Sequence, residues 1–159
     1  MIDCHVIFNK PTDREDWLQR CLTSLQHPQV RVKVHVFEES APVRPRRYAI
    51  LQAHDPSRWI MFADPDDYAV QPGYDNFVAF LQSTDADAVA PDEVVEARFG
   101  SQVTPGPHHL VALRGEALKH ISHFDEGQHY YNLWGQIQRF PEPAYCWRLH
   151  GSNTGGGRS

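Results

Sequence analysis

Three carboxylates follow a short apolar segment in the middle of the chain. Residues 59–63 are apolar, and Asp64, Asp66 and Asp67 come directly after them. Such a run is typical of a buried strand, which Asp and Pro then end. Neighbouring carboxylates stay ionised most easily around a cation, and oxygen ligands suit Mg²⁺ or Mn²⁺. The pattern predicts a divalent metal site or, alternatively, a polar turn whose Asp residues cap the next helix.

A second acidic pair, Glu38 and Glu39, follows the alternating, β-branched segment at 30–37. That segment is typical of a strand. In an open α/β sheet, ligands bind at the carboxyl ends of the strands, where both acidic clusters would meet. We therefore predict a nucleotide site, with one cluster for the base or ribose hydroxyls and one for a metal on the phosphates.

The elements that would position these residues alternate along the first ninety residues. Apolar patterns predict strands at 4–8, 30–37, 59–63, 87–90, 93–99, 109–113 and 145–149, and helices at 13–26, 46–53, from Pro72 onward, at 115–121 and at 130–139. Residues 100–107, rich in Gly and Pro, are expected to be a loop. This order predicts an α/β, Rossmann-like domain with a mostly parallel central sheet flanked by helices. Residues 1–150 would form the domain and 151–159 a flexible Gly-rich tail.

Composition narrows the function classes. The chain has 159 residues and a net charge of −5, so general attraction to nucleic acid is not expected. Its three cysteines show no paired spacing, and neither a signal peptide nor a membrane-length apolar stretch is apparent, so a cytoplasmic protein with reduced thiols is expected. Arg44, Arg46 and Arg47 could bind one anionic ligand or form a solvated helix face. The four tryptophans, Trp17, Trp59, Trp134 and Trp147, are predicted to be core residues.

The ordered motifs resemble the family 2 glycosyltransferases, nucleotide-diphospho-sugar transferases with the GT-A fold. The resemblance runs from about residue 4 to 153. It is carried by Val6-Ile7-Phe8-Asn9, Leu18 to Leu25, Val36-Phe37-Glu38-Glu39-Ser40, Arg46-Arg47-Tyr48-Ala49, Trp59 to Asp67, Pro72-Gly73-Tyr74, Phe124-Asp125-Glu126 and Tyr145 to Ser152. It implies a metal-dependent enzyme that moves a sugar from a nucleotide-diphosphate sugar, most simply a UDP-sugar, to a hydroxyl acceptor.

The resemblance also implies roles for individual residues. The donor-binding set would be Asn9, Glu38, Glu39, Arg47 and Asp64, with the glutamates on the nucleoside. Asp66, Asp64 and His150 would hold Mn²⁺ or Mg²⁺ on the diphosphate, with the ion acting as a Lewis acid. Asp67 would support the metal or face the donor sugar.

The chain departs from the family at the general base. Family members usually place Glu-Asp before a Tyr-Asp-Leu-Trp helix, whereas this chain has Tyr130 at the expected base position. Neutral Tyr is a poor base near pH 7. His129 or Asp125 could be the base, the acceptor could need little activation, or the protein could bind the nucleotide sugar without efficient transfer, as a binding or scaffolding module.

The segment that would contribute to an acceptor site is short in this chain. Few residues separate Ala90 from His109, so the acceptor site would be shallow, completed by another subunit in a homo-oligomer, or built for an accessible hydroxyl of a saccharide, protein or modified nucleic acid. His108 and His109 could contact the acceptor or simply begin a strand. A third possibility, a metal-dependent phosphohydrolase or nuclease, is disfavoured because Tyr68 stands where the haloacid dehalogenase-type motif has Thr or Val.

Overall fold

A computed structural model describes residues 1–107, 109–121 and 136–150. Its strands are β1 (Ile2–Asn9), β2 (Val30–Phe37), β3 (Trp59–Ala63), β4 (Tyr68–Ala69), β5 (Ala88–Ala97), β6 (Gly100–Thr104), β7 (Ala112–Leu113) and β8 (Gln138–Arg148). Its helices are α1 (Glu15–Ser24), α2 (Val43–Ala53), α3 (Gly73–Leu81) and α4 (Gly115–Lys119). The predicted strands at 30–37 and 59–63 have the same bounds in the structure.

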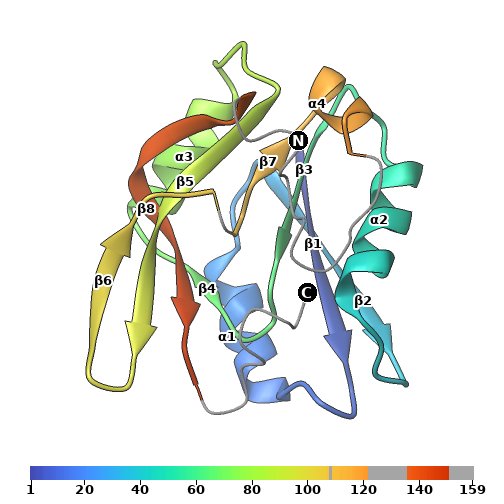
Figure 1. The fold of residues 1–159 in the computed structure, drawn as a ribbon, viewed down its shortest axis with the longest axis vertical. Helices are drawn as coiled ribbons and strands as arrows, with labels where there is room; N and C mark the ends of the chain where they lie inside the picture. Colours follow the sequence, from blue (N-terminus) through green and yellow to red (C-terminus); the bar gives the residue numbers. More distant parts are fainter. Residues whose placement is uncertain (108, 122–135, 151–159) are drawn as a thin grey trace.

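The described strands form one sheet in the order β2-β1-β3-β7-β5-β8-β4, with β6 paired to β5 (Figure 1). β1 is parallel to β2 and β3, and β5 is parallel to β8. The pairings of β7, β6 and β4 are antiparallel. The α/β class with flanking helices is confirmed, and the sheet is mixed because the antiparallel strand β7 joins its two parallel parts and β4 and β6 also pair antiparallel.

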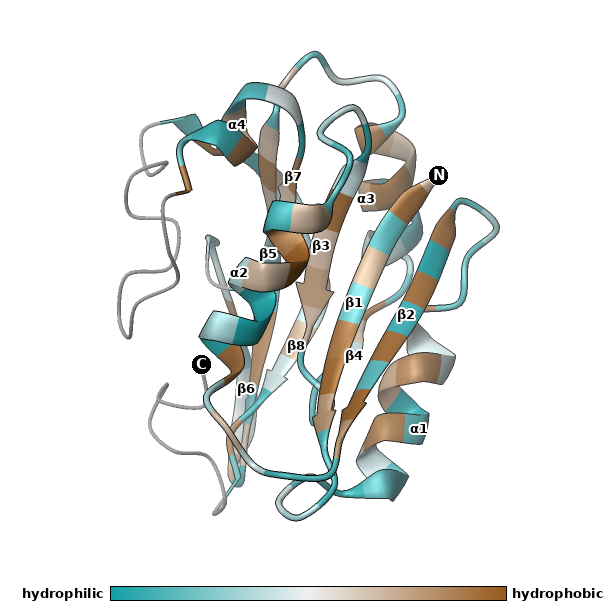
Figure 2. Ribbon diagram, turned by 90° about the vertical axis from the view of Figure 1, so that its right-hand side faces the viewer, coloured by the Kyte–Doolittle hydropathy of each residue, from teal (hydrophilic) through white to brown (hydrophobic). Residues whose placement is uncertain are grey.

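Helices cover both faces of the sheet, and each face has its own core. On one face, α1 and α3 pack on even-numbered residues of β1 and odd-numbered residues of β3, around Met61, Tyr74 and Phe77. On the other, α2 and α4 pack on Ile60 and Phe62. Figure 2 shows these helices on opposite sides of the sheet. β1 is buried along its whole length because strands flank it and helices cover it.

Close contact between α3 and β8 depends on a glycine. A Cβ added at Gly73 would lie 1.8 Å from the backbone oxygen of Pro143, so no larger residue fits. Next to it, the hydroxyl of Tyr74 donates to the backbone oxygen of Leu25 at 3.0 Å, which ties α3 to the end of α1. The sequence Pro72-Gly73-Tyr74 therefore begins a helix, as predicted, and also sets how closely the helix approaches the sheet.

Two predictions in the middle of the chain are wrong. The strands predicted at 87–90 and 93–99 are one continuous strand, β5, whose register against β8 shifts on either side of Asp92. Such a bulge takes up an extra residue without ending the strand. Residues 100–104 of the predicted loop form β6, which pairs back on β5 as a hairpin. The Gly and Pro residues of this stretch led to the prediction of a loop where the strand β6 forms.

The helix predicted at 130–139 is wrong at its end. Gln138 and Arg139 begin β8, which continues to Arg148 through Pro141 and Pro143. Proline is accepted in a sheet at edges and bulges, and these two lie where the β5–β8 register is irregular. The rest of that predicted helix, 130–135, lies outside the described residues.

The cysteines of this fold are buried groups. Cys4, Cys21 and Cys146 are all buried and form no disulfide. Burial raises the pKa of the Cys4 thiol to about 12, so it packs as a small apolar group rather than as a nucleophile. None of the helices within the described ranges is long and apolar enough to cross a membrane.

Candidate nucleotide and metal site

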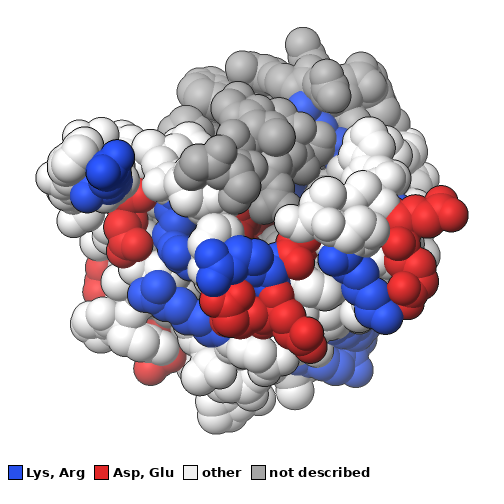
Figure 3. Space-filling view, turned by 90° about the horizontal axis from the view of Figure 1, so that it is seen from below, with Lys and Arg blue, Asp and Glu red and all other residues white. Residues whose placement is uncertain are grey.

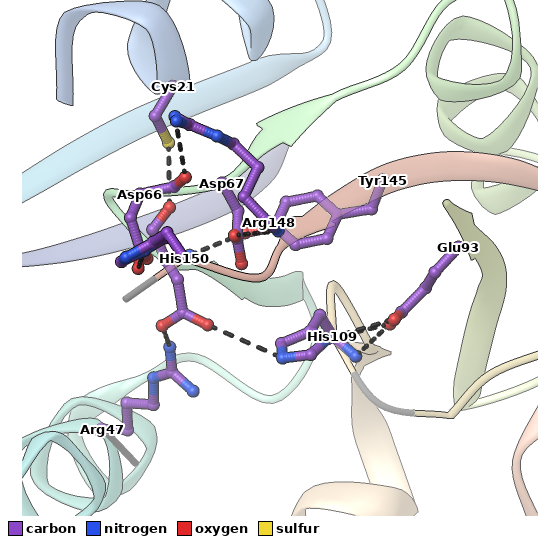
Figure 4. Close-up of polar contacts among 10 residues, drawn as sticks. Cys21, Arg47, Asp66, Asp67, Glu93, His109, Tyr145, Arg148 and His150 are labelled. Atoms are coloured by element: carbon purple, nitrogen blue, oxygen red, sulfur yellow. Dashed lines mark hydrogen bonds and ion pairs between the residues drawn. The ribbon is translucent and has the colours of Figure 1, made fainter. Parts of the chain in front are cut away.

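The turn after β3 is held by contacts from three parts of the chain. The backbone N–H of Asp67 donates to the backbone oxygen of Asp64 at 3.1 Å and closes the turn. From β8, the Tyr145 hydroxyl accepts from the Asp64 N–H at 2.8 Å, and the Arg148 N–H donates to Asp67 Oδ1 at 2.9 Å. From α1, Cys21 Sγ lies 3.4 Å from the Asp64 backbone oxygen (Figure 4). The carboxylates therefore extend from a fixed backbone.

This turn concentrates negative charge in a mostly buried place. Asp66 and Asp67 are 6% and 2% exposed, and Asp64 is more open. Burial, followed by the carboxylates of Asp64 and Asp66, raises the pKa of Asp67 well above its usual range. A cation relieves such repulsion. The alternative prediction, that these Asp residues cap the next helix, is wrong, since α3 has Pro72 at its N-cap and no side-chain capping bond.

Two predicted partners reach the acidic turn from distant segments. Arg47 of α2 donates from Nη2 to Asp64 Oδ1 at 2.5 Å. His150, just after β8, bonds Asp66 Oδ2 through Nε2 at 2.8 Å. Arg44 and Arg47 are both buried, so the interpretation of the arginine cluster as a solvated helix face is wrong for these two. The structure thus places Arg47 against Asp64 and His150 against Asp66 at the same turn.

A histidine–glutamate pair faces the same turn. His109 Nδ1 lies 3.1 Å from Glu93 Oε2, and the His109 backbone N–H donates to Glu93 Oε1 at 2.5 Å. On the other side of the ring, His109 Nε2 lies 4.0 Å from Asp64 Oδ2. Burial lowers the pKa of His109, but the bond to Glu93 and the carboxylates of Glu93, Asp64 and Asp67 outweigh it and raise that pKa to about 9.

Asp64, Asp67 and His109 form a group that could hold a metal ion. Each offers one ligand atom, and these atoms all lie within 4.8 Å of one another. Two carboxylates and an imidazole are a suitable donor set for Mn²⁺. Within the described ranges, the predicted trio Asp64, Asp66 and His150 does not form such a group, and His150 Nε2 bonds Asp66 Oδ2 at 2.8 Å.

The residues predicted for the nucleoside lie where β1 and β2 end side by side. Asn9 pairs in register with Phe37, so Glu38 and Glu39 follow at the same edge. Arg46 of α2 donates to the Asn9 side chain and, at 3.1 Å, to the Glu39 backbone oxygen. Its guanidinium lies 3.6 Å from the centre of the Phe37 ring. Asn9 is buried and Glu38 is exposed, with a 2.7 Å ion pair to Lys10.

The tryptophans divide between the core and the rim of the site. Trp59 is 5% exposed and lies in the core, as predicted. Trp17 and Trp147 are only partly buried, so their assignment to the core is wrong. The Trp17 ring lies 4.4 Å from that of His150, and the Trp147 ring 5.2 Å from that of His109, between ring centres. Both indoles therefore support site histidines.

Several predicted residues lie outside the described part of the chain. These are the base candidates His129 and Asp125, together with Tyr130, Trp134 and the tail 151–159. Glu93 was not predicted as a site residue, and His109 was expected only to contact the acceptor or begin a strand. The paired His108-His109 before a strand was the one available signal, and it does not identify Glu93 as a partner.

The face at the carboxyl ends of β1 and β2 carries both charges. Figure 3 views this face and shows Lys and Arg side chains interleaved with Asp and Glu, in the part not covered by undescribed residues. Interleaved charges favour local ion pairs such as Lys10–Glu38 over a broad field of one sign.

Comparison with known proteins shows the fold. Sequence comparison matches the chain to no protein family model and to no curated protein. The S. aureus TarS 1–349 structure matches with a TM-score of 0.64 and 14% identity, over 93% of this chain and 60% of that one. TarS 1–349 in complex with UDP matches at 0.66 and 14%, over 94% and 61%. TarS 1–349 in complex with UDP-GlcNAc matches at 0.64 and 13%, over 94% and 59%.

The chain thus spans 59–61% of the length of these TarS 1–349 structures. At this identity the likeness concerns the fold alone. It shows that the chain has a GT-A-like α/β fold with helices on both faces of a mixed sheet.

Proposed function

We propose that this protein binds a nucleotide-diphosphate sugar, with UDP as the nucleotide, together with a divalent cation, and transfers the sugar to a hydroxyl acceptor. One observation carries the proposal: Asp64, Asp67 and His109 converge within 4.8 Å directly after β3, at the edge where this fold binds ligands. TarS, which has the same fold, has been solved with UDP and with UDP-GlcNAc.

The donor would lie along the carboxyl ends of β1, β2 and β3. Asn9, Glu38 and Glu39 stand at the ends of β1 and β2, where hydroxyls and base edges need polar partners. Arg47 holds Asp64 in place at 2.5 Å and brings a fixed positive charge next to the expected diphosphate. The nucleoside would therefore lie toward β2 and the diphosphate toward the acidic turn.

Cation binding is proposed for the acidic turn. Asp64 and Asp67 would hold Mn²⁺ or Mg²⁺, and the predicted ligands Asp66 and His150 stand next to them as a bonded pair. When bound, such an ion supplies Lewis-acid stabilisation of the charge on the departing diphosphate. With the positive charge of the ion beside it, Asp67 would remain ionised, and its carboxylate could also face the donor sugar.

The acceptor hydroxyl needs a group that takes its proton. His129 and Asp125 are the proposed bases, since a histidine has a suitable intrinsic pKa and Tyr130 does not. The acceptor would approach on the β5–β7–β8 side, where Trp147 and His109 line the site. Saccharide, protein and modified nucleic acid hydroxyls remain candidate acceptors.

A second candidate function is a nucleotide-sugar binding or scaffolding module. The observation that favours it is Tyr130 at the position where the resembled family has its Asp base. Such a module would use the same acidic turn and the same strand ends, so binding alone does not separate it from an enzyme. Turnover separates the two: an enzyme releases UDP from a UDP-sugar when an acceptor or water is present.

Isothermal titration calorimetry tests the binding step. UDP and UDP-GlcNAc are titrated with Mn²⁺, with Mg²⁺ and with EDTA, into the natural protein and into Asp64→Asn. We expect binding that requires the metal and falls at least about tenfold in the variant, the size of effect expected when a ligand-orienting group is lost. Equal binding with EDTA, or none under any condition, would contradict the proposal. UDP release from UDP-GlcNAc then decides between transferase and binding module.

A further inference from the structure

Glu93 is a fully buried carboxylate whose partners among the described residues come from one other residue. It is 0% exposed on β5, and its bonds run to the backbone N–H of His109 and to Nδ1 of the same residue. A buried carboxylate is costly unless donors satisfy it. Because both donors belong to His109, Glu93 fixes the backbone and the ring of that histidine at once.

The backbone departs from regular strand geometry next to Glu93 and next to His109. Opposite the consecutive residues Asp92 and Glu93, β8 contributes Pro143 and Tyr145, so β8 has one extra residue beside Glu93. Leu110, directly after His109, has a φ of 50°, which is rare for a residue with a side chain. Leu110 is 1% exposed, so packing holds this conformation. Both departures from regular strand geometry therefore lie next to the Glu93–His109 pair.

The ring of His109 is also held in its plane by aromatic neighbours. Its centre lies 5.9 Å from that of Tyr145 in a stacked arrangement, and 5.2 Å from that of Trp147. With Nδ1 bonded to Glu93, the other nitrogen, Nε2, faces the acidic turn (Figure 4). In neutral His109, the proton shared with Glu93 stays on Nδ1, so Nε2 presents its lone pair toward Asp64 and Asp67.

This arrangement matches the way proteins prepare a histidine to bind a metal. A metal-binding histidine usually donates its second ring N–H to a carboxylate, which sets the tautomer and the ring orientation. His150 differs, because its Nε2 is already bonded to Asp66 Oδ2 at 2.8 Å. Of these two histidines, His109 is therefore the one whose inward nitrogen belongs to a three-residue ligand group.

We propose that His109 is a nitrogen ligand of the divalent cation, beside Asp64 and Asp67, and that Glu93 is the positioning residue that orients it. The inference rests on the proposed function for the presence of a cation at this turn, and it names a ligand that neither the sequence motif nor the resemblance assigns. Glu93 touches neither the ion nor the substrate; it acts through the ring of His109.

Mn²⁺ alone, without nucleotide, is the probe. Electron paramagnetic resonance counts bound Mn²⁺, and electron spin echo modulation detects a coordinated ¹⁴N. The variants are His109→Ala and Glu93→Gln, with His150→Ala as the matched control for loss of an imidazole. We expect His109→Ala to abolish the ¹⁴N signal of its imidazole and to weaken Mn²⁺ about 10–100-fold, and His150→Ala to keep a ¹⁴N signal.

Glu93→Gln keeps the side-chain shape but loses the charge that fixes the tautomer. We expect it to weaken Mn²⁺ about tenfold or more and to alter the ¹⁴N coupling, with a thermal unfolding midpoint close to that of the natural protein. Unchanged Mn²⁺ affinity and ¹⁴N modulation in His109→Ala would overturn the inference. A ¹⁴N signal that vanishes in His150→Ala and persists in His109→Ala would also overturn it.

Nucleotide titrations separate this inference from the proposed function. If UDP-GlcNAc binds with Mn²⁺ while His109→Ala leaves the metal unaffected, the ligand assignment fails and the proposed function stands. If Mn²⁺ binds through His109 but neither UDP nor UDP-GlcNAc binds, the ligand assignment stands and the proposed function fails.

Discussion

The hydroxyl of Tyr145 accepts a hydrogen bond from the backbone N–H of Asp64 at 2.8 Å, across 81 residues of sequence. Tyr145 is 0% exposed, so this bond lies in the core rather than at the rim of the site. It connects β8 to the turn after β3, and the placement of the acidic turn thus depends on a strand that lies far along the described chain.

Removing that hydroxyl should affect both stability and the site. Tyr145→Phe leaves the Asp64 N–H without its partner, which costs about 1–3 kcal/mol of unfolding free energy in a buried place. Tyr74→Phe is the matched control, since its hydroxyl bonds the Leu25 backbone oxygen at 3.0 Å away from the acidic turn. Chemical denaturation should show similar losses for both variants, with Mn²⁺ binding weakened only in Tyr145→Phe. Equal Mn²⁺ binding in the two would contradict a role for Tyr145 in placing the turn.

The negative charge of Asp67 should lower the unfolding free energy and strengthen cation binding. Its raised pKa means that ionisation is unfavourable in the folded protein, so its contribution to stability falls as pH rises above the ordinary carboxyl range. Asp67→Asn keeps an oxygen for the Arg148 N–H and removes the repelled charge. We expect unfolding free energy at pH 7, without metal, to rise by about 0.5–2 kcal/mol while Mn²⁺ affinity falls.

Asp66→Asn is the contrasting variant for that experiment. Its carboxylate bonds His150 at 2.8 Å, so removing the charge weakens a partnered contact and should not stabilise the protein. Thermal and urea unfolding of both variants in EDTA measures the difference. A loss of stability in Asp67→Asn would show that the charge of Asp67 is already compensated.

His5, on β1, should make the stability of the fold sensitive to mild acid. Burial, then the neighbouring His35, Lys33 and His54, lower the pKa of His5 to about 4 against the partial compensation of Asp3. Its Nε2 is buried and has no hydrogen-bond partner among the residues that the structure describes. Between pH 6.5 and about 4, His5 is protonated in the unfolded chain but stays neutral in the folded chain. The unfolding free energy that His5 contributes is therefore fully present above pH 6.5 and falls as the pH drops toward 4.

The measurement is unfolding free energy against pH for the natural protein and for His5→Phe. Between about pH 7 and pH 4.5, the natural protein should lose up to about 2.5 kcal/mol more than the variant. His120→Phe, at an exposed position after α4, controls for loss of a histidine elsewhere. Parallel pH profiles for the natural protein and His5→Phe would exclude His5 as the cause.

Much of the fold could be predicted because the relevant signals are local. Apolar runs ending in carboxylates located β2 and β3 with correct bounds, and the stripe around Leu18 and Cys21 located α1. The β5–β6 hairpin and β8 were missed for a common reason. Pro91, Pro141 and Gly100 lie at bulges and turns inside paired strands, where sequence rules place ends of strands.

The candidate site was only partly predictable. Asp64 and Asp66 follow an apolar strand, and that local pattern identified them. The pairing of His150 with Asp66 was implied only by the family resemblance, since 84 residues separate them. Glu93 could not be found from sequence, because its contact with His109 joins residues 16 positions apart and no local pattern marks that pairing.

A crystal structure with UDP and Mn²⁺, recorded at a wavelength where manganese scatters anomalously, tests the central claim most directly. We predict one anomalous peak bounded by Asp64, Asp67 and His109, with the UDP diphosphate on the peak and the nucleoside toward the ends of β1 and β2. UDP bound elsewhere, or at this edge with no manganese peak beside Asp64 and Asp67, would contradict a metal-dependent nucleotide-sugar site.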